Sequence, residues 1–203
     1  MEGIIEKRVH TLGSRFSQDV HGIFSNPKLA VHRIIEEADM PYATAVPFIV
    51  VIAAAIMSAI GVDMWAHIQL TAQTGSTLLQ ILSAVTRGVI LFFRIFYNSF
   101  AFLLAWVLWS VVFHFLGSIV SGTDIAGKRT FWRALKLAGF MFAPFFLNIL
   151  PFFPLITGYW SVYLAYIGMK ANYETTSTGA LIVTLPYLFS VVYGTFLFLL
   201  SLF

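Results

Sequence analysis

"DIAGKRTFWRALKLAGFMFAPFFLNILPFF", residues 124–153, places four basic side chains ahead of an almost unbroken aromatic and aliphatic run. From Phe131 to Leu150 the stretch has the roughly 20-residue length that crosses a bilayer core about 30 Å thick. Basic side chains near an anionic membrane surface are each worth about 1 kcal/mol. We therefore interpret this stretch as a membrane span, preceded by a headgroup and orientation anchor formed by Lys128, Arg129, Arg133 and Lys136.

The whole chain has the composition of a membrane protein. Its 203 residues are 59% hydrophobic and 10% charged, whereas soluble domains average about 25% charged residues. A soluble core could not bury this much apolar surface, so the composition predicts an all-α, polytopic membrane protein. The chain has no cysteine, which excludes disulfides, thiolate metal sites and cysteine nucleophiles.

Span length divides the chain into a polar arm and a membrane domain. Residues 1–43 carry an apolar stripe on one helix face, which suits either the headgroup layer or packing on the protein's own cytosolic surface. Asn26-Pro27 is expected to break this arm. The membrane domain, residues 44–203, is predicted to contain five spans, at residues 44–62, 88–120, 131–150, 155–171 and 179–203.

The connection between the first two spans carries a further amphipathic segment. Residues 76–86, "STLLQILSAVT", predict an interfacial helix on the outer side. Joined to the second span, this segment would form a helix of roughly 65 Å, which is too long for one straight crossing. A bend near Arg87-Gly88 is therefore expected.

The distribution of basic residues predicts the orientation. Ten of the twelve lysines and arginines precede the first span or border the second and fourth connections, and only Arg87 and Arg94 fall on the other side. The positive-inside rule then places the N-terminus in the cytosol and, with five spans, the C-terminus outside.

Polar groups inside the spans are candidate functional residues. Arg94 is expected at the outer boundary, with Asn98 one turn further on. Asp63 is the only acid on that side, so an Asp63–Arg94 or Asp63–Arg87 ion pair is predicted. His114, near the inner end of the second span, has no carboxylate in its span and is interpreted as a packed, hydrogen-bonded histidine.

Two prolines are expected to kink their spans, because proline removes a backbone donor and clashes with the preceding turn. These are Pro144 in the third span and Pro186 in the fifth. Gly139 and Asn148 flank Pro144 and suit close approach or hydrogen bonding between helices. A kinked pair can open a polar path or a lipid-facing groove, but such residues are also common in packed spans, and both interpretations stay open.

The sequence carries no pattern for catalysis or cofactor binding. It lacks Gly-x-Ser-x-Gly, a glycine-rich phosphate loop and paired carboxylates within the spans. His10, His21 and His32 are spaced by eleven residues, but the break at Asn26-Pro27 spoils their alignment. The chain is therefore expected to be no enzyme, with no metal, cofactor or nucleic-acid partner.

Three stretches, in this order and spacing, resemble the Yip domain family of Ypt/Rab-interacting integral membrane proteins. They are "NPKLAVHRII" (26–35), "GKRTFWRALKLAGFMFAPFF" (127–146) and "YWSVYLAYIGMKANYETTSTGALIVTLPYLFSVVYGTFLF" (159–198). The resemblance implies five spans, a cytosolic N-terminus, partner proteins of the same family and, in eukaryotic members, small GTPases in vesicle traffic. A prokaryotic-type member of the family is expected, for which the location would be the cell membrane.

Two functions follow as hypotheses. The first is a non-enzymatic membrane organiser or adaptor that acts through helix packing and interfacial contacts with lipids or proteins, including homo- or hetero-oligomers. The alternative is a small transporter, channel or lipid-translocating protein with a path near Pro144 and Pro186, lined by Arg94, Asn98, His114 and Asn148.

Overall fold

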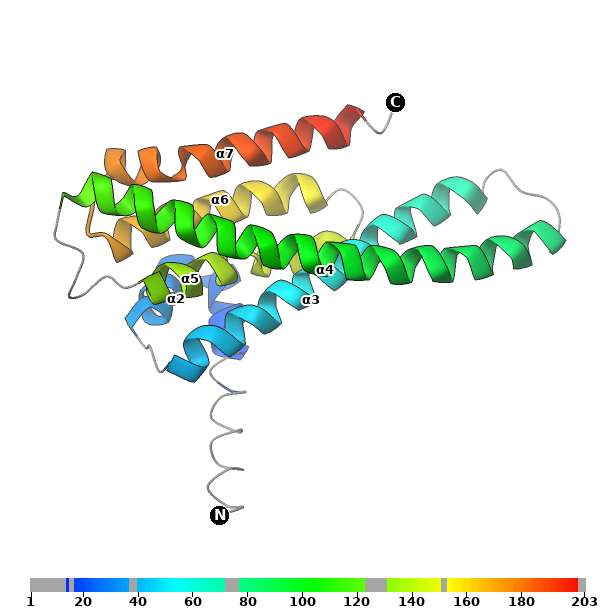
Figure 1. The fold of residues 1–203 in the computed structure, drawn as a ribbon, viewed down its shortest axis with the longest axis horizontal. Coiled ribbons are helices and arrows are strands. Elements are labelled where there is room, and N and C mark those ends of the chain that lie inside the picture. The colour runs from blue at the N-terminus through cyan, green and yellow to red at the C-terminus, as the bar shows by residue number, and fades with distance from the viewer. Residues whose placement is uncertain are drawn as a thin grey trace, which may run out of the picture.

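The protein is an elongated assembly of helices. The computed structural model describes residues 14, 17–36, 40–71, 77–122, 131–150 and 153–200, and within them all regular structure is helical, as predicted. Figure 1 shows the elements, which are α2 (Pro27–Glu36), α3 (Met40–Thr71), α4 (Thr77–Ser121), α5 (Phe131–Phe140), the 3-10 helix η1 (Ala143–Ile149), α6 (Phe153–Asn172) and α7 (Ser177–Leu200).

The break predicted at Asn26-Pro27 is confirmed. Residues 17–25 are helical, Asn26 is not, and α2 starts at Pro27. The Asn26 side-chain oxygen accepts a hydrogen bond from the Leu29 N–H at 3.4 Å, which is the pattern of a helix N-cap. Proline follows at the first helical position, where its missing N–H costs nothing.

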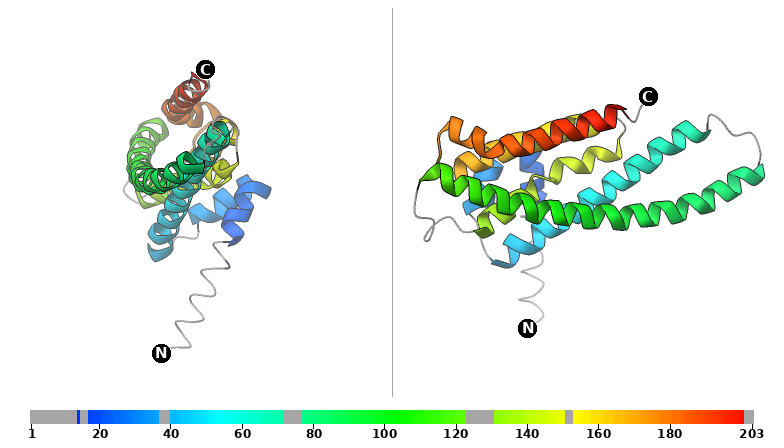
Figure 2. Two further views of the ribbon diagram at one scale, coloured as in Figure 1. Left: turned by 90° about the vertical axis from the view of Figure 1, so that its right-hand side faces the viewer. Right: turned by 45° about the horizontal axis from the view of Figure 1, so that its top comes forward.

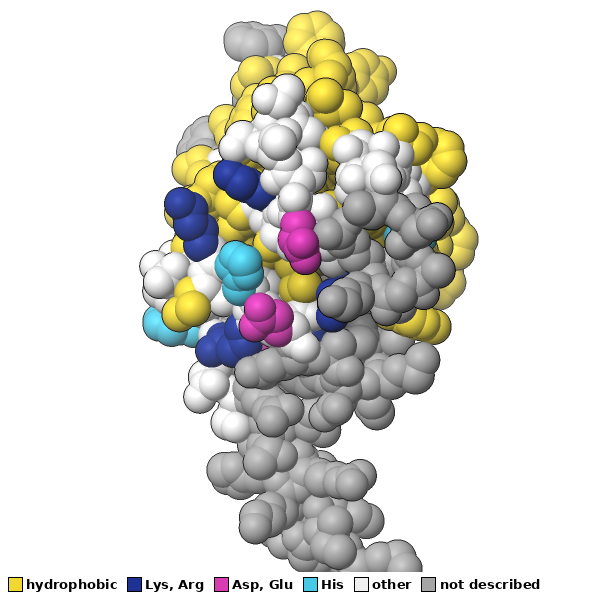
Figure 3. Space-filling view, turned by 90° about the vertical axis from the view of Figure 1, so that its left-hand side faces the viewer, with side chains coloured by type: hydrophobic (Ala, Val, Ile, Leu, Met, Phe, Trp, Pro, Cys, Tyr) yellow, Lys and Arg dark blue, Asp and Glu magenta, His cyan; other side chains and the backbone are white. Residues whose placement is uncertain are grey.

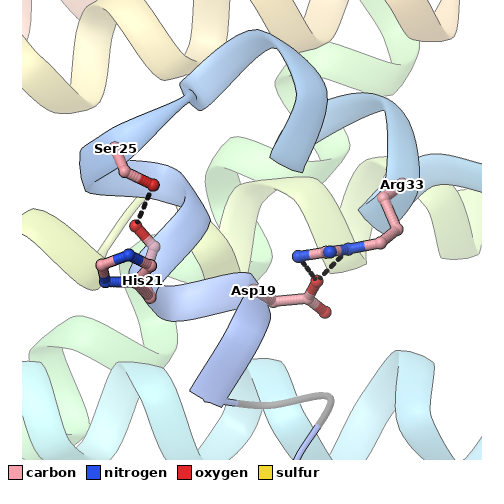
Figure 4. A network of polar contacts seen from close by, with 4 residues as sticks. All are labelled: Asp19, His21, Ser25 and Arg33. Carbon is pink, nitrogen blue, oxygen red and sulfur yellow. Dashed lines mark hydrogen bonds and ion pairs between the residues drawn. The ribbon is translucent and has the colours of Figure 1, made fainter.

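The described part of the arm packs on the protein itself. Asp19 Oδ1 accepts a hydrogen bond from Arg33 Nε at 2.8 Å, and Arg33 Nη2 lies 2.8 Å from the same oxygen in an ion pair (Figure 4). In the helix formed by residues 17–25, Ser25 donates to the His21 carbonyl oxygen at 3.0 Å, and Ile23 is buried in the core. For residues 17–25 this arrangement fits the packing alternative, whereas residues 1–13 of the predicted stripe lie outside the described residues.

The two longest helices, α3 and α4, pack against each other. Their connected ends extend beyond the rest of the molecule, to the right in Figure 1, and Figure 2 shows the same extension. α4 is one helix of 45 residues, about 68 Å long. The separate interfacial helix predicted for residues 76–86, ending at Arg87-Gly88, is therefore wrong. A single glycine costs a helix only about 1 kcal/mol, and α4 contains no proline.

The third predicted span is not a continuous α-helix. α5 ends at Phe140, a turn follows at Met141 and Phe142, and η1 then continues the segment with Pro144 in its first turn. In an α-helix the Pro144 ring would clash with the Phe140 carbonyl. The outcome is a change of helix type, so the kink predicted at Pro144 is corrected to a helix end. Pro186, in contrast, lies inside α7 without ending it.

The core lies where α3, α5, η1 and α6 meet, with α4 and α7 packed outside them. Gly61 of α3 rests directly on the Asn148 carbonyl of η1, and Gly139 of α5 rests on Pro47 of α3, with no room for a Cβ at either site. Small residues at such crossings let helix backbones approach closely. The expected role of Gly139 in a close helix contact is thus confirmed.

Three of the described helical stretches are long and apolar enough to cross a membrane. They are Ala45–Met64, Gly88–Ser121 and Ser177–Leu197, which correspond to the first, second and fifth predicted spans. The third predicted span is divided between α5 and η1, and the fourth corresponds to α6. A count of five spans and the orientation of the chain therefore stay predictions.

Candidate functional site

Charged side chains gather at one end of the molecule, the left-hand end in Figure 1. Figure 3 faces this end and shows basic, acidic and histidine side chains in a patch bordered by apolar surface. α2 contacts both α5 and α6 there, so segments far apart in the sequence contribute to the patch. We call this region, in which Lys28, His32, Lys170 and Glu174 line one pocket, the charged end.

The four anchor residues predicted from the sequence have different positions. Arg133 of α5 is partly exposed, but Lys136 is only 1% exposed. The expected headgroup contact of Lys136 is therefore corrected, because α5 is buried from Ala134 to Phe140 and the lysine does not lie at an exposed surface. Lys128 and Arg129 lie outside the described residues.

A buried set of polar side chains joins three elements. The Asn148 amide of η1 donates to Ser58 Oγ of α3 at 3.0 Å, and its carbonyl oxygen accepts from Thr157 Oγ1 of α6 at 2.6 Å. All three residues are buried. We call this set the polar bridge. Both ends of the Asn148 amide are paired, so its arrangement serves to hold the helices together.

A second buried pair lies next to Pro186. Ser161 Oγ of α6 and Tyr187 Oη of α7 are 2.8 Å apart, and Trp109 of α4 packs edge-on against Tyr187 with ring centroids 4.8 Å apart. The sequence did not indicate Ser161 or Tyr187. Thr157 and Ser161 are four residues apart, which puts both hydroxyls on one face of α6. This spacing is the signal in the sequence that could have indicated a buried polar face.

The outer ion pair predicted from the sequence is present. Arg94 Nη1 of α4 lies 4.0 Å from Asp63 Oδ1 of α3, and both side chains are partly exposed. Among the described residues this Nη1 atom has no hydrogen-bond partner, so the contact is a loose ion pair. Asn98, one turn along α4, is partly exposed, whereas the side chain of Arg87 is not described.

His114 is hydrogen-bonded within the bundle, as predicted. Its Nδ1 lies 3.4 Å from Tyr173 Oη, and its ring packs edge-on against Phe131 at 5.8 Å between centroids. Tyr173 is buried against Gly117, where a Cβ would overlap the tyrosine ring. This contact connects the C-terminal part of α4 to the residue that follows α6.

The residues predicted to line a path do not form one site. Arg94 and His114 are twenty residues apart on the same helix, a separation of about 30 Å. Asn148 is buried and paired with Ser58 and Thr157 in the polar bridge. A groove of about 430 Å³ does open between α4, η1, α6 and α7, but its lining is mostly apolar and aromatic, including Phe102, Trp109 and Phe145.

The outer surfaces of α4 and α7 define the class of protein. Large apolar side chains on both are more than half exposed, among them Phe92, Phe96, Phe100 and Phe189. Water does not tolerate so large a continuous apolar surface, whereas lipid is its ordinary environment. The molecule is an α-helical membrane protein.

The chain belongs to the Yip1 domain family. The match to the family extends over residues 22–199, from the helix before α2 to the end of α7, and confirms the resemblance found in the sequence. No match was found among curated proteins or among solved structures.

Proposed function

We propose that this protein is a non-enzymatic membrane organiser that acts by packing its exposed helices against partner spans. In this arrangement the chain crosses the membrane five times, with the charged end in the cytosol. α6 has 20 residues, about 30 Å of helix, and α5 and η1 together extend about 29 Å. Both segments are therefore long enough to cross a bilayer core.

The observation that carries the proposal is the aromatic face of α4. Phe92, Phe93, Phe96, Tyr97 and Phe100 are each at least 63% exposed, and their spacing of one and four residues puts them on one broad helix face. Arg94 lies on the opposite side, toward α3.

An aromatic helix face of this kind suits partner helices from the same or a related protein. Its large rings gain dispersion contacts when another span packs on them. The satisfied polar bridge supports packing rather than conduction, because its buried groups are already paired. A small GTPase is the soluble partner implied by the family, and the charged end is the surface that would meet it.

Crosslinking tests the proposal in native membranes. Because the chain has no cysteine, Phe96→Cys on α4 and Phe189→Cys on α7 each introduce a single thiol at a similarly exposed position. We expect crosslinked species from Phe96→Cys in clear excess over Phe189→Cys. Equal yields from the two variants would contradict a specific packing role for the α4 face.

A further inference from the structure

α2 and α6 enclose a cavity of about 620 Å³ at the charged end. Its lining includes Lys28 and His32 of α2, Tyr163, Tyr166 and Lys170 of α6, and Glu174 just beyond α6. We call it the cationic pocket. None of these lining residues belongs to the polar bridge.

Among the described residues no ion pair joins either lysine to a carboxylate, although Glu174 lines the same pocket. Lys170 Nζ donates to the neutral Ser177 Oγ at 2.9 Å, and the ion pairs described in the structure are Arg33–Asp19 and Arg94–Asp63. A hydroxyl group does not neutralise an ammonium. An anion entering the pocket would therefore gain charge-assisted hydrogen bonds.

A lysine at position 28 does not stabilise α2. It occupies the first turn of α2, where the positive end of the helix dipole disfavours a cation. His32 lies four residues further on, so the two side chains share one helix face, and both are exposed. The opposite face, with Ala30, Val31 and Ile34, is buried. Residues that break a local rule in this way are typical of functional sites.

A stripe on α6 leads from the lipid-facing surface into the pocket. Ile156, Tyr159 and Tyr163 are 60%, 45% and 37% exposed, and Tyr166 and Lys170 continue the same spacing of three and four residues. The stripe changes from aliphatic to aromatic to cationic over about 21 Å of helix. Tyrosine is enriched at the membrane interface because its ring is apolar and its hydroxyl is polar.

We propose that the cationic pocket binds the phosphate of an anionic phospholipid, with one acyl chain lying along the α6 stripe. Lys28 and Lys170 bind the phosphate oxygens, and the rings of Tyr163 and Tyr159 contact the part of the acyl chain nearest the headgroup. The stripe is what favours a phospholipid over a soluble phosphate, because a soluble ligand would make no use of an exposed apolar row that ends at the pocket. This assignment does not depend on the organiser role proposed above.

Native mass spectrometry of the full chain released from nanodiscs tests the assignment. The nanodiscs contain phosphatidylcholine with a minor share of phosphatidylglycerol, and the readout is the ratio of the two lipids retained per protein. We expect the wild type to retain one phosphatidylglycerol molecule in preference to phosphatidylcholine. The double variant Lys28→Gln/Lys170→Gln should lower this preference about 30-fold, since each lysine near the surface contributes an effect of about fivefold. Lys28→Arg/Lys170→Arg is the matched control and should keep the preference.

Two arms of the experiment need only the wild type. Glycerol 3-phosphate added in millimolar excess should leave the retained phosphatidylglycerol in place, because the soluble headgroup lacks the contacts along α6. Displacement by glycerol 3-phosphate would overturn the lipid assignment in favour of a soluble anion. Equal retention of both lipids by the wild type would overturn the proposal that the cationic pocket binds an anionic phospholipid. An unchanged preference in the glutamine variant would overturn it as well.

Discussion

Asn148 shows how a single side chain joins helices that are distant in the sequence. Its amide reaches Ser58, ninety residues away, and Thr157 in the following helix. The sequence identified Asn148 as a residue for bonding across an interface, but not its partners. Nothing in the hydrophobic pattern of either helix indicates which hydroxyl faces it, because that depends on the tertiary packing.

Asn148→Leu should destabilise the protein by about 1–2 kcal/mol, because the buried Ser58 and Thr157 hydroxyls each lose a partner. Reversible unfolding in mixed micelles measures the change. Asn98→Leu, which alters a partly exposed amide on α4, is the matched control and should change stability by less than about 0.5 kcal/mol. Similar effects of the two substitutions would mean that the polar bridge adds nothing to stability.

Other single residues show where sequence reasoning succeeds and where it stops. The Asp63–Arg94 pair was predictable because only one acid lies on that side of the membrane domain. The burial of Lys136 was not predictable, because its three-residue spacing from Arg133 suggested that the two side chains share an exposed face. The structure buries α5 almost completely from Ala134 onward, and a burial of that extent is set by neighbouring helices.

At the scale of elements, helix ends and crossings depend on proline and glycine in ways that spacing only partly reveals. Pro144 and Pro186 look alike in the sequence, yet one follows a helix end and the other lies inside a helix. After the helix end at Phe140, the turn and η1 bring Asn148 against Gly61 of α3. The length of α4 was underestimated for a related reason, since Gly88 weakens a helix without breaking it.

The α3–η1 crossing should be sensitive to one methyl group. In Gly61→Ala the new Cβ falls on the Asn148 carbonyl, so the helices must move apart at a cost of about 1–3 kcal/mol. Gly194→Ala on α7 meets nothing within 4 Å and should stabilise its helix by about 0.5–1 kcal/mol. Thermal unfolding in detergent compares the two. If both substitutions shift stability in the same direction, the close crossing is not as described.

At the scale of the whole molecule, composition predicted the helical membrane class, and the Yip1 domain match confirms the family. Three apolar helices suffice by length and composition to cross a membrane. The remaining two crossings rest on α5 with η1, and on α6. These segments are largely buried in the bundle, so their sequences carry more polar and small residues than a lipid-facing span. Hydropathy alone therefore identifies them poorly as membrane spans.

The number of crossings is the central claim, and labelling of Leu150→Cys tests it most directly. Leu150 is an exposed residue between η1 and α6, and the chain supplies no other thiol. With five spans, a membrane-impermeant maleimide should label Leu150→Cys and Gly88→Cys on intact cells, and Ser25→Cys and Ser177→Cys only after the cells are opened. Labelling of Leu150→Cys only in opened cells, while Gly88→Cys reacts from outside, would contradict five crossings and leave three.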